Sequence, residues 1–377
     1  MSLIHLFTLG FRENYLIPGL IIGIIMASYA FIRLSYLFSY YGISKRNSLI
    51  LRSIFSIFII VCSANVQSTV TLLIAYLFGC SLLVDIIGIA YKLISKKGLK
   101  IHKNGILAII LFIIVIAYSA YGLSTVSETD YNITTDKTNE SYTILYISDI
   151  HYDTIQDPNI LVNKISEMNA VHPDFIVLGG DVTDEGTSRE SMIKVFEELG
   201  TLNSTYGTYF IYGNHDRQPK VGDYRDGTKP YSNDELVSVI KKNNIKILED
   251  DSVVINNDIV LVGRKDAGHG NDIKRAAISD LVNNSSVSKN SSKFVLVLDH
   301  QPLDEGNVSK VADLMISGHT HGGQIFPYGL VTDLSGKPNY GLYSFGSMKE
   351  IVSSGFCGWG IPLRNECNCE YVVVKVN

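Results

Sequence analysis

Residues 317–323 read Ser-Gly-His-Thr-His-Gly-Gly and directly follow the apolar run Leu314–Ile316. Two imidazoles on a glycine-flanked turn after a short strand are typical of a metal-binding loop. Four upstream apolar runs also end in metal-ligating residue types: Tyr142–Ile147 before Asp149-Ile-His151, Phe175–Leu178 before Gly180-Asp181, Tyr209–Tyr212 before Gly213-Asn214-His215-Asp216, and Phe294–Leu298 before Asp299-His300. Functional residues of α/β sheets gather beyond the carboxyl ends of strands, so we expect these five strand ends to converge on one site.

Helical spacing of apolar residues separates these strands. It predicts helices over four segments: Asn159–Asn169, Ser188–Leu199, Asp234–Asn243 and Ile273–Val282. Ser232 or Asn233 is the expected cap of the third helix. The alternation predicts one α/β domain over residues 142–377.

The first third of the chain differs in composition from the rest. Hydrophobic residues make up 46% of the chain and charged residues only 18%, and most long apolar runs precede residue 124. The four runs are Leu16–Phe38, Ser48–Ser63, Val66–Ile94 and Gly105–Leu123. About 20 apolar residues cross a bilayer. A cleavable signal peptide explains only one run, and a buried helical core fits poorly because the runs are apolar all round. We therefore predict a transmembrane region of four helices over residues 1–123.

Basic residues on the connecting loops predict the orientation. Lys45 and Arg46 lie between the first two runs, and five lysines lie around the start of the last one: Lys92, Lys96, Lys97, Lys100 and Lys103. The positive-inside rule places both loops in the cytoplasm. We therefore expect a multi-pass protein of the cell membrane with an extracytoplasmic domain after residue 141.

Two charges lie deep in the apolar runs, Arg33 in the first and Asp85 in the third, and Arg52 lies near the start of the second. Charges at membrane depth are costly unless they are paired. Their similar depth in two runs of the same direction suggests an ion pair between the helices. The alternative is that both side chains snorkel to the cytoplasmic interface.

The stretch from Ser124 to Ser141 is rich in Ser, Thr, Asn and Asp and has no apolar periodicity. It is therefore predicted to be a polar linker over residues 124–141. A linker of this length keeps the following domain near the bilayer, which favours a substrate in the membrane or just outside it.

The candidate metal ligands offer only oxygen and nitrogen. They are Asp149, His151, Asp181, Asn214, His300, His319 and His321. Such donors suit Mn, Fe or Zn better than a thiolate site would. The net charge of −5 gives no case for nucleic-acid binding.

Taken in order, these motifs resemble those of the calcineurin-like metallophosphoesterase superfamily. The motifs are Asp149-x-His151, Gly180-Asp181-x-x-Asp184, Gly213-Asn214-His215-Asp216, His300 and Gly318-His319-x-His321. The final Gly-His-Thr-His-Gly-Gly-Gln, with Phe326-Pro327 and the later Gly360-Ile361-Pro362-Leu363-Arg364, is similar to a membrane-associated bacterial phosphodiesterase branch that includes UDP-diacylglucosamine pyrophosphatase-like enzymes. The segment around Cys367–Cys369 departs from that branch.

The resemblance implies a fold and a ligand assignment. The fold is a four-layer αββα sandwich that follows the transmembrane helices. Two divalent metal ions would be bridged by Asp181, with Asp149, His151 and His321 on one ion and Asn214, His300 and His319 on the other. A metal-bridging hydroxide would then attack the phosphorus atom.

The resemblance also implies two catalytic residues outside the ligand set. His215 would protonate the leaving oxygen or stabilise the phosphoryl charge, and Asp216 would orient its imidazole. The alternative for His215 is a packing role under Asn214.

Several neighbouring residues allow two interpretations each. Asp184 and Asp299 are either partners of the ligands or turn residues. His269 either lines the site or lies on a solvent loop, and Arg264 either contacts phosphate or faces solvent.

Two features near the end of the chain also stay open. Phe356, Trp359, Ile361 and Pro362 either touch an acyl chain or the bilayer, or form a buried turn. Cys357 forms a disulfide with Cys367 or Cys369, or all three are free thiols.

The resemblance implies a metal-dependent hydrolase of phosphodiester or pyrophosphate bonds, and the membrane helices favour a lipid-linked or cell-envelope phosphoester substrate. Ser/Thr protein phosphatases of the superfamily typically carry Arg-Gly and Gly-Asn-His-Glu where this chain has Asp184-Glu185-Gly186 and Asp216, which disfavours that activity. A non-enzymatic membrane sensor or scaffold is the alternative. A transporter-like role for the helices is less simple than anchoring.

Overall fold

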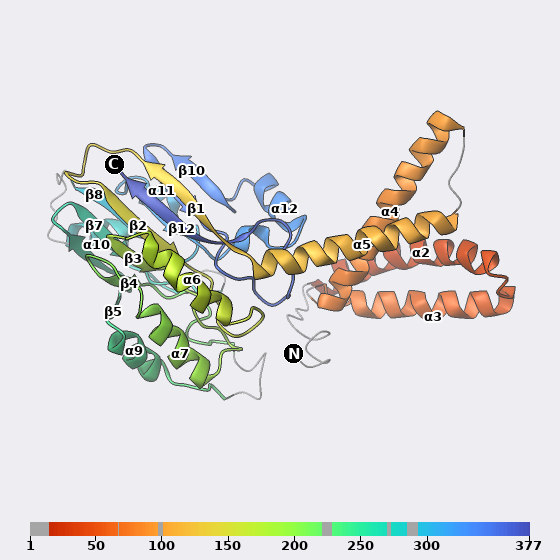
Figure 1. Cartoon of the computed structure of the whole chain (residues 1–377), viewed down its shortest axis with the longest axis horizontal. Helices are drawn as coiled ribbons and strands as arrows, with labels where there is room; N and C mark the ends of the chain where they lie inside the picture. Colours follow the sequence, from red (N-terminus) through yellow and green to blue (C-terminus); the bar gives the residue numbers. More distant parts are fainter. Residues whose placement is uncertain (1–14, 67, 97–100, 221–227, 270–272, 285–292) are drawn as a thin grey trace. The chain divides into compact units, whose positions relative to one another are not determined.

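The computed structural model describes residues 15–66, 68–96, 101–220, 228–269, 273–284 and 293–377 (Figure 1). The chain forms two compact units, Met1–Tyr118 and Ser119–Asn377. We describe them in turn.

Four long helices make up the described part of the first unit and the start of the second. They are α2 (Leu16–Tyr40), α3 (Lys45–Ser63), α4 (Thr69–Ser95) and α5 (Ile101–Ser124). All four are long and apolar enough to cross a membrane, α5 from Lys103 onward. Ser44 and Ser68 are the N-caps of α3 and α4. Their side chains accept hydrogen bonds from backbone N–H groups of the first helical turn, which fixes where each helix begins. The prediction of four apolar helices is confirmed.

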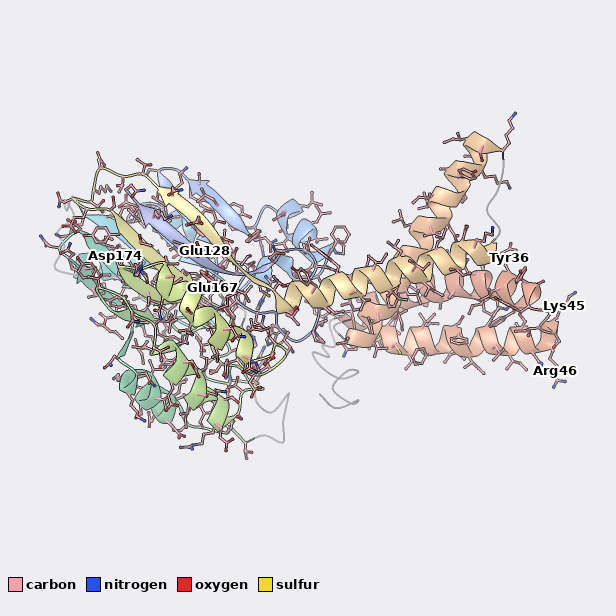
Figure 2. All side chains as sticks on the ribbon, viewed as in Figure 1. Tyr36, Lys45, Arg46, Glu128, Glu167 and Asp174 are labelled. Carbon is pink, nitrogen blue, oxygen red and sulfur yellow. The ribbon has the colours of Figure 1, made fainter. Side chains whose placement is uncertain are left out.

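Arg33 of α2 and Asp85 of α4 form an ion pair. Arg33 Nε lies 3.1 Å from Asp85 Oδ2. The Tyr29 hydroxyl donates to the same carboxylate at 2.8 Å and Asn104 Nδ2 donates at 3.3 Å. The pairing prediction is therefore confirmed over snorkelling. Figure 2 shows Lys45 and Arg46 at the start of α3, where α2 turns into α3.

Two six-stranded sheets form the second unit. The first has the order β1-β12-β2-β3-β4-β5 and the second the order β10-β11-β9-β8-β7-β6. The first contains β1 (Val126–Ile133), β2 (Tyr142–Ile147), β3 (Phe175–Leu178), β4 (Thr208–Phe210), β5 (Ile245–Ile247) and β12 (Cys369–Val376). The second contains β6 (Asp251–Ile255), β7 (Ile259–Gly263), β8 (Phe294–Leu298), β9 (Leu314–Ser317), β10 (Gly341–Phe345) and β11 (Met348–Val352). Strands β2 to β5 run parallel, and so do β7 to β9.

Alternate side chains of a strand pack on opposite faces of its sheet, and one of these faces contacts the other sheet. On β2, Tyr142, Ile144 and Tyr146 pack toward the second sheet, whereas Leu145 and Ile147 pack toward helices. The helices on that outer face are α6 (Asn159–Ala170), α7 (Arg189–Leu199) and α9 (Asn233–Lys242). A third apolar cluster joins the second sheet to α10 (Ile278–Asn284) and α11 (Glu305–Val308). The unit is a sandwich of helix, sheet, sheet and helix layers, as predicted.

The linker prediction is wrong for much of its length. Val126–Ile133 is strand β1, which pairs in parallel with β12. It is an edge strand, and only its two end residues are buried. Backbone groups make the hydrogen bonds between β1 and β12, so a polar sequence can form this edge strand.

The helix predictions hold with one exception. Ser232 caps α9 by accepting from Glu235 N at 3.1 Å, as expected. The predicted helix Ile273–Val282 begins only at Ile278, so its first turn is not helical.

Candidate metal centre

The predicted ligands stand at the carboxyl ends of five strands. Asp149 and His151 follow β2, Asp181 follows β3 and Asn214 follows β4. In the other sheet His300 follows β8, and His319 and His321 follow β9. The parallel direction of these strands brings both sets of ends to one side of the sandwich.

Tight turns aim these side chains. Five ligands have backbone φ angles in the left-handed region: Asp149 at 54°, His151 at 42°, Asp181 at 52°, His319 at 69° and His321 at 51°. Non-glycine residues adopt this conformation seldom, and strained backbone conformations cluster at functional sites. Gly180 also has a positive φ, of 90°, and a Cβ there would lie 2.4 Å from Gly213 N. Glycine is therefore required where the β3 and β4 loops touch.

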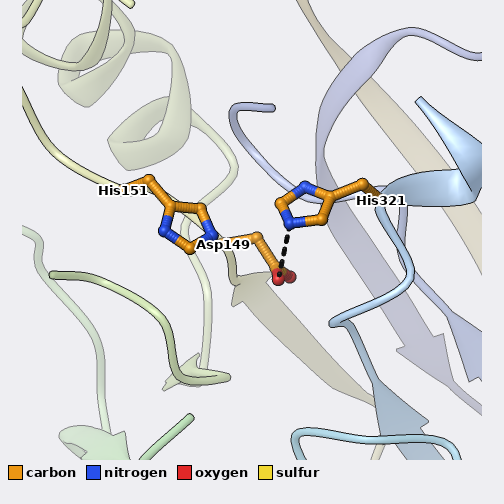
Figure 3. Close-up of side chains that lie close together, drawn as sticks. All are labelled: Asp149, His151 and His321. Carbon is orange, nitrogen blue, oxygen red and sulfur yellow. Dashed lines mark ion pairs between the residues drawn. The ribbon is translucent and has the colours of Figure 1, made fainter. Parts of the chain in front are cut away.

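Asp149, His151 and His321 form the first ligand cluster. Their ligand atoms all lie within 4.8 Å of one another. His321 Nε2 is 3.7 Å from Asp149 Oδ1, the pair marked in Figure 3. The His151 and His321 rings face one another with centroids 5.2 Å apart. A cation between these groups would contact one carboxylate and two imidazoles.

Asp181, His300 and His319 form the second cluster, again within 4.8 Å. Asp181 Oδ2 lies 3.1 Å from His300 Nε2 and 3.8 Å from His151 Nε2, so it faces both clusters. Its other oxygen accepts the His215 N–H at 2.8 Å. A carboxylate placed in this way can bridge two cations and offset their mutual repulsion.

Oxygen atoms near Nδ1 orient three of the histidines. His300 Nδ1 lies 2.9 Å from the Gly179 carbonyl and His321 Nδ1 lies 3.1 Å from the Cys357 carbonyl. His151 Nδ1 is 3.2 Å from Asp184 Oδ2. An Nδ1–H donor at a carbonyl leaves the Nε2 lone pair for a metal, which is the usual arrangement of metal-binding histidines.

Buried polar atoms without partners support the same assignment. His151 Nε2 and Asn214 Oδ1 are buried and have no hydrogen-bond partner among the described residues. A buried polar atom of this kind is costly unless something binds it. Oxygen and imidazole donors fit Mn, Fe or Zn. The residues present therefore fit divalent cations.

The charge states of His319, His321 and Asp181 suit cation binding, whereas nearby carboxylates raise the pKa of His151 and of His300 despite their burial. Burial, together with nearby positive groups, lowers the pKa of His319 and of His321 to about 4. Both rings are thus neutral at pH 7, as a ligand must be. Burial raises the pKa of Asp181, but His300, His215 and His151 outweigh burial and hold it well below its usual range.

A third cluster borders the ligands and contains Glu185, His215 and His269. His215 Nδ1 lies 2.6 Å from Glu185 Oε2, and the Trp359 ring stacks on the imidazole at 5.1 Å. Burial alone would lower the pKa of His215, but Asp181 and Glu185 raise it to about 9. His269 approaches Asn214 Nδ2 at 3.3 Å, so it lines the site.

The role expected for Asp216 is wrong. Its carboxylate accepts from the backbone N–H groups of Asp181, Thr183 and Gly213 at 2.7–3.0 Å. It therefore ties the β3 loop to the β4 loop, and Glu185 instead orients His215. The sequence motif placed Asp216 beside His215 along the chain but did not show which way its side chain points.

Two further residues with open interpretations are structural. Arg264 is buried and pairs with Asp304 at 2.9 Å, so it neither contacts phosphate nor faces solvent. Asp299 pairs with Arg275 at 2.5 Å behind the ligand His300.

The segment after β11 makes contacts with the site that the sequence did not predict. Arg364 is fully buried and donates to the carbonyls of Cys357 at 2.8 Å, His321 at 3.0 Å and Ser354. It holds the loop that carries His321. Phe356 is buried in the helix-side core, whereas Trp359 lies against His215. Cys357, Cys367 and Cys369 are free thiols.

The sequence of this chain is similar to those of known proteins. Residues 142–323 match the family model described as calcineurin-like phosphoesterase. An uncharacterized metallophosphoesterase of Helicobacter pylori is 32% identical over 232 residues, which cover 61% of this chain and 58% of that protein. The uncharacterized metallophosphoesterase YkuE of Bacillus subtilis is 30% identical over 238 residues, covering 60% of this chain and 75% of that protein.

The chain is also similar to a relative that is named as a transmembrane protein. The transmembrane protein with metallophosphoesterase domain of Danio rerio is 27% identical over 279 residues, covering 68% of this chain and 59% of that protein. The chain thus spans less than two thirds of the Helicobacter and Danio relatives. This chain belongs to the calcineurin-like metallophosphoesterase family.

Proposed function

We propose that this chain is a membrane-anchored phosphoesterase that hydrolyses a phosphodiester or pyrophosphate bond with two divalent metal ions. The observation that carries the proposal is Asp181 Oδ2, which faces His151 and His300 at the junction of the two ligand clusters. Asp149, His151 and His321 would hold one ion, and Asn214, His300 and His319 the other. Bound ions of this kind lower the pKa of a shared water and neutralise charge on the phosphoryl group.

The protein's own residues would supply the proton for the leaving oxygen. Glu185 holds His215 Nδ1, so Nε2 is the atom left to donate a proton. Trp359 covers one face of the imidazole and restricts its rotation. General acid catalysis of this type contributes roughly 10²–10⁴-fold.

A lipid-linked or cell-envelope substrate fits the anchoring helices best. α5 leads almost directly into β1, with only Thr125 between Ser124 and Val126, so the catalytic unit has little freedom to leave the membrane surface. The basic residues Lys45 and Arg46 favour a cytoplasmic α2–α3 loop and hence an extracytoplasmic catalytic unit in the cell membrane. Mn, Fe and Zn all suit the ligands.

The test uses the full chain in phospholipid vesicles. Purified protein is analysed for bound metal and assayed with bis(p-nitrophenyl) phosphate, a monoester and a nucleotide-linked lipid, each with Mn, Fe or Zn. We expect about two ions per chain and diester or pyrophosphate hydrolysis, and His215→Ala should lower turnover roughly 10²-fold or more. Bound metal without turnover of any substrate would refute the hydrolase and favour a metal-holding membrane sensor or scaffold.

A further inference from the structure

Helix α12 (Tyr328–Leu334) of the second unit exposes an apolar face. Tyr328 is 67% exposed, Leu330 48%, Val331 59% and Leu334 80%. Residues three and four apart share a face of a helix, so these side chains form one patch. Contiguous apolar patches of this kind mark interaction sites.

The opposite side of α12 is fixed to the ligand-bearing loop. Gly329 is buried there, and a Cβ added to Gly323 would lie 2.3 Å from Gly329 N. Gly323 ends the short 3₁₀ turn η2 (His321–Gly323) that begins with a ligand. Glu366 accepts the Gly329 and Leu330 N–H groups at 2.7 and 2.9 Å and so caps the first turn. The patch therefore has a defined position relative to His321.

The same segment is bonded to the end of α5. Asn365 Oδ1 accepts the Phe326 N–H at 2.9 Å, and Asn365 Nδ2 donates to Ser119 Oγ at 2.8 Å. Arg364 N donates to the Ser119 carbonyl at 2.9 Å. Gly122 allows this approach, because a Cβ there would lie 2.4 Å from the Arg364 carbonyl oxygen. Ser119 belongs to the last apolar helix, Lys103–Ser124.

These contacts identify what covers the patch. Two hydrogen bonds connect the start of the α12 segment to the last turns of an apolar helix that can cross a membrane. The segment from Phe326 to Leu334 has Asp333 as its one charged residue. Tyrosine and aliphatic side chains on one face of a helix are what a bilayer interface accepts.

We propose that α12 lies on the bilayer surface, with Tyr328, Leu330, Val331 and Leu334 in the interfacial region. The occupant of the patch is therefore lipid of the membrane that α5 crosses. Because α12 packs against the loop that carries His319 and His321, this contact keeps the metal centre close to the headgroups. This inference rests on the proposed function. It assigns to the site a phosphoester substrate whose reacting bond lies at the depth of the lipid headgroups.

The contact is tested by photocrosslinking in the full chain. The protein is placed in vesicles of phosphatidylethanolamine and phosphatidylglycerol that contain a small fraction of lipid with a diazirine near the headgroup. After irradiation, labelled peptides are mapped by mass spectrometry. We expect label on Tyr328–Leu334 and about a tenfold loss of it in Val331→Glu, because a charge opposes interfacial burial.

Val254→Glu is the matched control. Val254 is an exposed residue of β6, at the far edge of the sheet from β10, and the same change there should leave the α12 label unchanged. Leu334→Ser is a second variant. The Leu334 side chain is exposed, so this change should leave the second unit folded. Label on α12 no stronger than on β6, or crosslinks from α12 to a second copy of the chain, would overturn the proposal.

A second measurement concerns the substrate. Val331→Glu should lower hydrolysis of a phosphodiester lipid in vesicles about tenfold and leave hydrolysis of soluble bis(p-nitrophenyl) phosphate unchanged. Equal loss on both substrates would overturn the substrate assignment. Crosslinking needs no turnover, so failure of the proposed hydrolase and failure of the membrane contact give different results.

Discussion

Replacing Glu185 by Gln tests the charge that holds His215. The two side chains meet at 2.6 Å, and they are 1% and 8% exposed. Glutamine keeps an oxygen that can accept from Nδ1 and fills the same space. The change thus removes the charge and preserves most of the packing.

The magnitude follows from the type of bond that is lost. A hydrogen bond to a charged group contributes about 1.5–3 kcal/mol and a neutral one about 0.5–1.5 kcal/mol. The difference of about 1.5 kcal/mol corresponds to roughly tenfold in rate if the imidazolium is present in the transition state. The substitution should also change the pH dependence of activity. Burial lowers the pKa of His215 and Glu185 raises it, so the variant has the lower pKa. Activity should then fall at a lower pH on the alkaline side than in the wild type.

The assay compares aryl phosphodiesters with poor and good leaving groups across pH 6–10. A general acid matters most for a poor leaving group, so the tenfold loss should appear there and nearly vanish for p-nitrophenolate. Glu185→Asp should recover part of the lost rate. Glu249→Gln is the control, since that carboxylate pairs with Arg217 at 2.8 Å. An equal loss for both leaving groups, or an unchanged alkaline limb, would refute the positioning role.

Three further predictions concern other charges. Burial, followed by Glu305, raises the pKa of Glu350 to about 8, so wild-type stability should fall as pH rises from about 4.5 to 8. Glu350→Gln should lack that loss and melt at higher temperature above pH 8, as followed by fluorescence of Trp359, the single tryptophan. Arg33→Asp and Asp85→Arg should each destabilise the helices by about 3 kcal/mol, and the double exchange should restore stability in detergent unfolding. Asp181→Asn should lower bound metal from about two ions per chain to one or fewer by elemental analysis, and unchanged metal content would contradict its bridging position.

The convergence of the candidate ligands could be predicted because each one is specified by the residues next to it in the sequence. Each candidate ligand lies within four residues of the end of a short apolar strand. Because these strands are parallel, their carboxyl ends lie on the same side of the sandwich. The α9 cap was predictable for the same reason, since Ser232 bonds a group three residues away. Local chemistry of this kind needs no knowledge of the tertiary fold.

Contacts between distant segments were not predictable. Strand β1 pairs with β12 about 240 residues later, and its polar sequence carries no apolar alternation that would mark a strand. Glu185 meets His215 across 30 residues, whereas the motif suggested the adjacent Asp216. Helix α12 was not predicted either, because it packs on Gly323 and Glu366 and leaves its apolar side exposed. In each case a partner, Glu366 in the case of α12, lies 30 or more residues away along the chain.

The shape of the metal centre depends on buried networks more than on the ligands themselves. Five ligands adopt left-handed backbone conformations, which cost about 1 kcal/mol each for residues with a Cβ. Asp216 offsets part of this cost by accepting three backbone N–H groups around Asp181, and Arg364 does so by donating to carbonyls around His321. Hydrogen bonds to charged groups contribute about 1.5–3 kcal/mol each, so two such networks suffice to hold the strained turns. The protein's own hydrogen bonds therefore hold the loops that carry the candidate ligands in these conformations.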